Sequence, residues 1–170
     1  YIGVGYNRFV ITYTDISKNE TALYYESETE VGMTEGLNGG VVLDDNARVN
    51  FAYFSGKASI FKATVIAVSY DYCYNNSGVQ KGWFLGGGIS SVKTEIEPNS
   101  LTTASSQSSS WFVLRGGYEY LMDNNLFFEV GYNMHLAKQE YNYDYINESD
   151  EGSSTFSVNN LNLSLSYMFQ

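Results

Sequence analysis

Apolar and polar residues alternate along the last fourteen residues of the chain, Ser157 to Gln170. The two alternating sets are Leu161, Leu163, Leu165, Tyr167 and Phe169 on one parity and Asn160, Asn162, Ser164 and Ser166 on the other. Because successive side chains of a β-strand point to opposite faces, this pattern predicts a strand with one apolar and one polar face. The apolar face of such a strand meets either a protein core or lipid.

Similar alternation predicts eight strands, at about 1–14, 29–43, 47–56, 61–74, 80–93, 110–122, 126–138 and 156–169. The connections after the second, fourth and sixth strands are short and rich in turn-forming residues, at 44–46, 75–78 and 123–125. Of the others, 15–28, 94–109 and 139–155 are long and polar, and 57–60 is brief. Short and long connections therefore lie at opposite rims of the predicted sheet, as in bacterial outer-membrane barrels.

Aromatic residues gather on the apolar faces near the short turns. They are Tyr72, Tyr74, Trp83, Tyr118, Tyr120, Tyr167 and Phe169. Tyrosine and tryptophan concentrate at membrane interfaces, so this set is typical of the aromatic girdle of a membrane barrel. The alternative is the core of a soluble sandwich, which the clustering of the rings at one rim disfavours.

Composition favours the same class of fold. No apolar stretch approaches the ~20 residues that a membrane helix needs. The chain has one proline against sixteen tyrosines, ten phenylalanines and sixteen glycines, which suits many strands. A single cysteine, Cys73, excludes an internal disulfide and is expected to be a buried small residue rather than a nucleophile. The chain starts at Tyr1 in strand-like sequence, so we expect any export signal to have been removed or omitted.

Three segments carry a resemblance to a known family: residues 1–6 (YIGVGY), 116–120 (GGYEY) before the turn at 123–125, and 163–169 (LSLSYMF). Over essentially its whole length the chain resembles the eight-stranded outer-membrane barrels of the OmpA and OmpX family. The resemblance implies an all-β, antiparallel up-and-down transmembrane barrel that forms a single domain over 1–170. It also implies a bacterial outer-membrane location, with loops extracellular and both termini periplasmic.

The same resemblance implies that the barrel-assembly machinery inserts the chain, since the terminal strand is similar to the signal that this machinery reads. One departure is Gln170, which follows the aromatic residue at which such proteins usually end. We expect this residue to affect assembly efficiency rather than the fold. No peptidoglycan-binding domain of the kind that OmpA carries is expected after the last strand.

Charged residues on the predicted inner faces gather near the short turns. They are Arg48, Asp71, Arg115, Glu119 and Glu129. An eight-stranded barrel is only wide enough for its own side chains, and unpaired charges there are costly. We therefore predict an ionic cluster that plugs the lumen, with Arg48 facing Asp71 and Arg115 serving Glu119 and Glu129. The alternative role for this cluster is a gate or a proton path.

The sequence predicts no catalytic residue and no cofactor. His135 is the only histidine, and the Leu136-Ala137 that follows it lacks the His-x-Ser spacing of lipid A deacylases. A serine from the third long connection is the remaining way to complete a catalytic set. The expected role of His135 is a polar residue of the lumen.

The sequence predicts no metal site either. Asn147, Ser149 and Glu151 with Gly152 resemble half of an EF-hand loop, but Val158 stands where the closing glutamate belongs.

Two further charges do not fit the alternation, because Arg8 and Glu35 share the parity of apolar neighbours. They either pair across the first hairpin, extend to lipopolysaccharide headgroups, or turn inward at a bulge.

Acidic residues at the outer rim account for the net charge of −10. Residues 15–30 contain one lysine and five acidic residues, and so do residues 138–152. Glu95 and Glu97 supply the remaining two negative charges. An acidic rim argues against nucleic acid and favours solvated loops, divalent bridges to lipopolysaccharide, or a basic partner. Tyr141, Tyr143 and Tyr145 are candidates for an exposed strand edge that binds protein, or for packing on neighbouring loops.

These observations together predict a monomeric, non-enzymatic outer-membrane barrel with a plugged polar lumen and a structural or adhesive role. Its expected surroundings are outer-membrane lipid and lipopolysaccharide. The alternatives are a narrow channel for ions or small solutes, a lipid A-modifying enzyme that depends on His135, and a soluble ligand-binding barrel.

Overall fold

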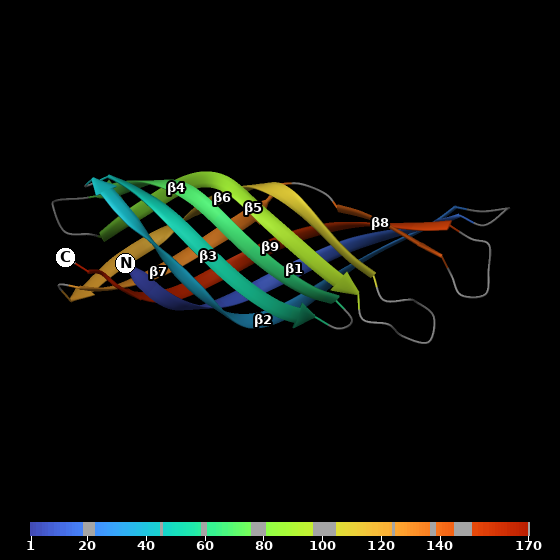
Figure 1. Cartoon of the computed structure of the whole chain (residues 1–170), viewed down its shortest axis with the longest axis horizontal. Helices are drawn as coiled ribbons and strands as arrows, with labels where there is room; N and C mark the ends of the chain where they lie inside the picture. The colour runs from blue at the N-terminus through green and yellow to red at the C-terminus, as the bar shows by residue number, and fades with distance from the viewer. Residues whose placement is uncertain are drawn as a thin grey trace.

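The computed structural model describes residues 1–18, 23–44, 46–58, 61–75, 81–96, 105–123, 125–136, 139–144 and 151–169, which are almost entirely strand (Figure 1). The strands are β1 (Ile2–Lys18), β2 (Leu23–Asp44), β3 (Ala47–Ala58), β4 (Phe61–Asn75), β5 (Lys81–Ile96), β6 (Ser105–Asp123), β7 (Leu126–His135), β8 (Gln139–Asp144) and β9 (Glu151–Tyr167). No helix in these ranges is long and apolar enough to cross a membrane.

The sheet closes on itself. Each strand from β1 to β6 pairs antiparallel with the next, β7 pairs with β9, and β9 pairs with β1. β8 also pairs with β9, beyond the end of β7, so β7 and β8 occupy one position in the wall. The result is an eight-stranded antiparallel barrel, which confirms the predicted fold class. Both chain ends lie at one end of the barrel, here called the terminus end, and β8 lies towards the other, the loop end (Figure 1).

Several strands extend further than the alternation predicts. β1 and β2 pair as far as Lys18 and Leu23, β6 begins at Ser105, and β9 begins at Glu151. The backbone ladder continues there although most residues on both parities are polar, Ile16 and Leu23 being exceptions. Where both faces of a sheet meet water, nothing selects an apolar face, and the period-two signal disappears.

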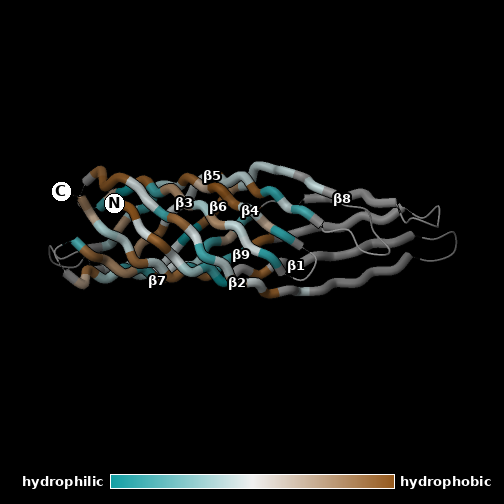
Figure 2. Tube along the Cα trace, turned by 60° about the horizontal axis from the view of Figure 1, so that its bottom comes forward, coloured by the Kyte–Doolittle hydropathy of each residue, from teal (hydrophilic) through white to brown (hydrophobic). Residues whose placement is uncertain are grey.

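Hydrophobic and hydrophilic residues are interleaved along the strands (Figure 2), and many of the apolar side chains are exposed on the exterior of the barrel. Val4, Leu37, Leu85 and Ile89 are each more than half exposed, and the seven predicted girdle residues are between 38% and 67% exposed. Rings of the girdle meet edge to face, with centroids 4.9 Å apart for Tyr72 and Tyr74. An exterior of this kind suits lipid rather than water.

Arg8 and Glu35 lie on this exterior. Arg8 is opposite Met33 on β2, Glu35 is opposite Tyr6 on β1, and the β1–β2 register runs without a bulge. Both side chains are exposed, so the alternative that a bulge turns them inward is wrong.

Candidate functional site

Side chains fill the barrel interior in two layers. Near the terminus end the inward side chains are charged and include all five residues of the predicted ionic cluster. Towards the loop end they are mainly apolar and at most 3% exposed: Phe54, Ala63, Val65, Val92, Trp111, Val113 and Val158. The candidate functional site is therefore the lumen, with an ionic layer and an apolar layer stacked along its axis.

Arg48 of β3 is the centre of the ionic layer. Its Nε lies 3.1 Å from Asp71 Oδ2, its Nη1 2.5 Å from Glu119 Oε2, and its Nη2 2.7 Å from Glu129 Oε2. The side chain is only 4% exposed. All three guanidinium nitrogens donate to carboxylates, so this one side chain ties β3 to β4, β6 and β7 inside the barrel.

Arg115 of β6 is the second cation of the layer. Its Nη2 lies 2.6 Å from Glu129 Oε1, and its Nε lies 3.4 Å from Asp71 Oδ1. The predicted pairing of Arg115 with Glu119 is wrong, because Glu119 is bound by Arg48 instead. The two residues lie four positions apart on one extended strand, which separates their backbones by about 13 Å. Arg48 reaches Glu119 from another part of the wall.

The aromatic ring of Phe84 lies close to both guanidinium groups. Its centroid lies 4.7 Å from Arg48 Cζ and 5.0 Å from Arg115 Cζ, within the range of cation–π attraction. Gly117 makes room for the ring: a Cβ there would lie 2.7 Å from Phe84 Cζ and 2.2 Å from the carbonyl oxygen of Val130. Sequence reasoning missed Phe84, since nothing in the alternation distinguishes an inward phenylalanine on a polar face.

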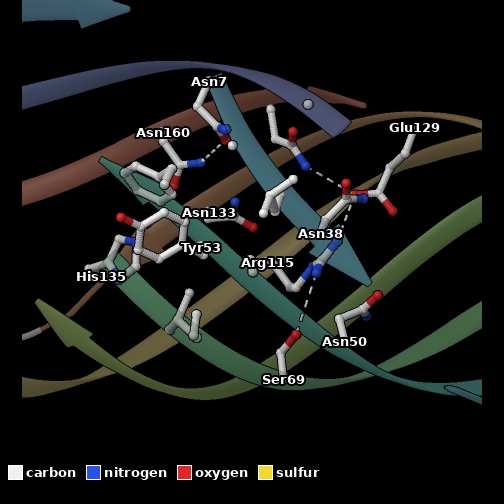
Figure 3. Close-up of a pocket in the computed structure, with 18 residues that line it drawn as sticks. Asn7, Asn38, Asn50, Tyr53, Ser69, Arg115, Glu129, Asn133, His135 and Asn160 are labelled. Atoms are coloured by element: carbon white, nitrogen blue, oxygen red, sulfur yellow. Dashed lines mark hydrogen bonds and ion pairs between the residues drawn. The ribbon is translucent and has the colours of Figure 1, made fainter. Parts of the chain in front are cut away.

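A small polar cavity of about 30 Å³ lies between the two layers. Its polar lining includes Asn7, Asn50, Ser69, Asn133, His135, Asn160 and Asn162 (Figure 3). Asn160 Nδ2 donates to Asn7 Oδ1 at 3.0 Å, and Asn50 Nδ2 donates to Asp71 Oδ2 at 2.5 Å. A cavity of this volume holds about two water molecules, at ~10–15 Å³ each. The lumen thus contains a polar cavity bounded by the ionic layer on one side and the apolar layer on the other.

His135 faces this cavity and contacts Ser90, a residue that sequence reasoning did not select. Its Nδ1 lies 2.9 Å from Ser90 Oγ, and its ring lies 6.1 Å from that of Trp111. His135 and Ser90 are 4% and 3% exposed, beneath the apolar layer. Among the described residues no carboxylate binds the other ring nitrogen, Nε2. The serine–histidine pair is enclosed within the barrel interior, and a catalytic set of this type also needs an acid that orients the histidine.

The remaining candidates lie apart from the ionic layer and the cavity, or outside the described residues. Cys73 is buried and free. Tyr141 and Tyr143 are in β8, opposite Ser154 and Gly152 of β9, so this part of the fourth connection does form a strand. Tyr145 and most of the half EF-hand segment lie outside the described residues. Within those residues no three histidine, cysteine or carboxylate side chains are grouped as a metal site.

Several solved outer-membrane proteins have a similar fold. Neisserial surface protein A superposes with a TM-score of 0.64 at 14% sequence identity, over 96% of this chain and 97% of that one. OprG from Pseudomonas aeruginosa gives 0.55 at 13% identity, over 98% and 97% of the two chains. The N-terminal barrel domain of Pseudomonas aeruginosa OprF gives 0.53 at 12% identity, over 91% and 96%. No family model and no curated protein sequence matches the chain. At these identities the likeness shows the fold, that of an eight-stranded outer-membrane β-barrel.

Proposed function

We propose that this chain is an integral outer-membrane protein with a closed lumen, whose activity resides at the loop end of the barrel. The observation that carries the proposal is the ionic layer, in which Arg48 of β3 binds carboxylates of β4, β6 and β7 at 2.5–3.1 Å inside the barrel. Movement of a solute along the axis requires these contacts to break, and buried charges left without partners are costly. The lumen therefore serves as a rigid core.

The proposed membrane orientation rests on the different lengths of the connections at the two ends of the barrel. We infer that the loop end is extracellular and that both termini are periplasmic, because short turns face the periplasm in barrels of this class. Lipid and lipopolysaccharide then surround the apolar exterior. The barrel-assembly machinery is the expected partner during insertion, nucleic acid is not an expected partner, and the barrel is expected to act as a monomer.

Unpaired strand edges at the loop end support a surface role. Residues 105–112 of β6 pair with β5, while β8 pairs with β9, and no pairing joins β6 to β8 in the described part of the wall. The β6 segment Ser105–Ser110 contains neither a charge nor a proline, the usual protections of an exposed edge. Such edges bind extended segments of other proteins through backbone hydrogen bonds. The proposed role is adhesion or another protein interaction at the cell surface.

An adhesion assay tests this role. Bacteria that display the barrel are expected to bind cultured epithelial cells more than bacteria with an empty vector. The double substitution Ser106→Pro/Ser108→Pro blocks the β6 edge and is expected to remove the gain, whereas Ser106→Thr/Ser108→Thr keeps it. Equal adhesion with and without the barrel, at equal surface expression, would refute the surface role.

The second candidate function is a narrow ion channel, favoured by the polar cavity of about 30 Å³ between the layers. This function requires a path through both the ionic layer and the apolar layer. Conductance measurements distinguish the two functions.

A further inference from the structure

Two side chains of opposite charge lie on the outward face of the first two strands. Arg8 of β1 and Glu35 of β2 are both exposed. Their neighbours on this face are apolar, since Arg8 lies opposite Met33 on β2 and Leu161 on β9, and Glu35 lies opposite Tyr6 on β1. Among the described residues, neither makes an ion pair with the other or with a third side chain. A charge on a lipid-facing wall is unfavourable unless it finds a partner.

The register of the wall gives the positions of these two charges along the barrel axis. A row of directly opposed residues that starts at Leu114 reaches Val41 of β2 by way of β5, β4 and β3. Followed in the other direction, through β7, β9 and β1, the same row reaches Val31 of β2. The row therefore climbs ten residues of β2 towards the loop end in one turn around the wall. With about 3.3 Å per residue and about 4.8 Å between strands, such a climb over eight strands tilts them by about 40° from the axis.

This tilt places Arg8 and Glu35 side by side at nearly the same height. A step from β1 to the directly opposed residue of β2 climbs about 3 Å towards the loop end, and two residues along a strand climb about 5 Å. Glu35 lies one such step across from Arg8 and two residues back towards the terminus end, so its height differs by only about 2 Å. Around the wall the two backbones are about 8 Å apart. Tyr6 and Met33 lie between them, Met33 towards the loop end and Tyr6 towards the terminus end.

This arrangement of charges is complementary to a second copy of itself. Barrels in one membrane share one orientation, so a symmetric pair has its two-fold axis parallel to the barrel axes, and residues meet residues of the same height. When the axis passes beside Tyr6 and Met33, Arg8 of each copy faces Glu35 of the other. A single contact then forms two ion pairs and leaves neither charge facing lipid.

The apolar residues on the terminus side of the charges fit the same symmetry. They border a hollow of about 640 Å³ on the exterior, whose lining includes Val4, Tyr6, Leu163 and Leu165. By the same heights, Leu165 lies on the line through Tyr6 and Met33, and Leu163 and Val4 lie on either side of this line. A second copy therefore brings its own leucine and valine side chains to the hollow, where they form an apolar seam.

We propose that two copies of this chain pair in the membrane through the outward face of β9, β1 and β2, with two reciprocal Arg8–Glu35 ion pairs beside the apolar seam. Charge complementarity selects a second copy as the occupant, because one surface supplies both the cation and the anion. The closed barrel needs no partner to fold, so the monomer expected above is the form that inserts and the state at low density in the membrane. The pair forms at high density by mass action.

Disulfide cross-linking of the refolded barrel in phospholipid vesicles tests the proposal. In a Cys73→Ser background, Tyr6→Cys or Met33→Cys places a thiol beside the two-fold axis, where it meets the same thiol of the other copy. Oxidation is expected to give a covalent dimer from either variant. The matched control is Ile89→Cys, at a position 63% exposed and of similar height on β5, which lies across the wall from β1. It is expected to give no cross-link beyond random collision.

Charge reversal distinguishes pairing between copies from an ion pair within one copy. Arg8→Glu and Glu35→Arg, each combined with Tyr6→Cys, are expected to reduce the cross-link at least about tenfold, because like charges then face each other across the interface. A mixture of the two variants is expected to recover the cross-link as a heterodimer, identified by its mass, because each cation again faces a carboxylate of the other copy. An ion pair within one chain gives no such recovery, since each variant keeps two like charges on its own wall. Circular dichroism checks that every variant is folded.

Three outcomes would overturn the proposal: cross-linking of Ile89→Cys equal to that of Tyr6→Cys and Met33→Cys, no loss when either charge is reversed, or no heterodimer from the mixture. Absence of any cross-link at rising ratios of protein to lipid would leave this face to lipid and also overturn it. The measurement involves neither adhesion nor conductance, so its failure is distinguishable from failure of the proposed function.

Discussion

Replacement of Arg48 by alanine is the sharpest test of the ionic layer. The substitution removes the guanidinium that contacts Asp71, Glu119 and Glu129, whose side chains are 0%, 10% and 2% exposed. Arg115 is then the only cation left among the five residues of the cluster. It contacts Asp71 and Glu129, which leaves Glu119 without a cationic partner.

The expected cost follows from this geometry. Breaking a buried ion pair by removal of one partner typically lowers stability by about 3–5 kcal/mol, because the remaining charge stays buried. Loss of the stacking of Arg48 on Phe84 acts in the same direction. We therefore expect Arg48→Ala to lower the free energy of unfolding by about 3–5 kcal/mol, a large part of the ~5–15 kcal/mol typical of a folded domain.

Urea unfolding in phospholipid vesicles, followed by the fluorescence of Trp83 and Trp111, measures this change. Arg8→Ala is the matched control, because it removes the same side chain from the exterior and is expected to cause no loss of stability. Glu119→Gln in the Arg48→Ala background removes the carboxylate charge that has lost its partner and is expected to recover part of the lost stability. A loss below about 1 kcal/mol, or no recovery from Glu119→Gln, would refute the reasoning.

Three further predictions concern other parts of the barrel. Arg8→Leu is expected to raise the free energy of unfolding by about 2 kcal/mol, because arginine on a lipid-facing wall is unfavourable; a decrease in the same urea assay would contradict this. Phe84→Ala is expected to lower the free energy of unfolding by about 3–5 kcal/mol, because it leaves a cavity beside two guanidinium groups. A change under about 1 kcal/mol would count against a stabilising contact of the ring with these groups. Glu95 lies beyond the apolar exterior, where its hydrogen bond to Lys93, and then that to Lys62, hold the pKa of its carboxyl below the usual value. A lowered folded pKa means that these contacts stabilise the fold above the unfolded pKa and are lost as the pH falls through the folded pKa; carbon NMR titration should show the lowered pKa in wild type and its return in Lys62→Ala/Lys93→Ala.

The alternation in the sequence was enough to predict the barrel wall. It indicated which face of each strand is apolar, because lipid on one side and a packed lumen on the other select opposite residue types. The Arg48–Asp71 pair was also predictable, since both residues are inward and close to short turns; they lie directly opposite on β3 and β4. The sequence pattern therefore predicts contacts between residues that lie opposite each other on neighbouring strands.

Contacts across the lumen were beyond the sequence pattern. The Arg48–Glu119 pair and the Ser90–His135 contact each join strands that are not neighbours in the wall, and they depend on the register at which the barrel closes. Alternation with a period of two shows which face of its strand a residue occupies. It does not show where that residue lies along the barrel axis relative to residues of distant strands. The strand extensions at the loop end were missed for a different reason, since polar residues predominate on both parities there.

Single-channel conductance of the refolded protein in planar lipid bilayers tests the closed lumen most directly. Insertion is verified independently, by protease protection of the barrel in vesicles made from the same lipid. The account predicts no conductance steps for the wild-type protein and for Arg8→Ala. Steady steps from the wild-type protein that change with Arg48→Ala, Arg115→Ala or Glu119→Ala would contradict the closed lumen and identify the protein as a small channel.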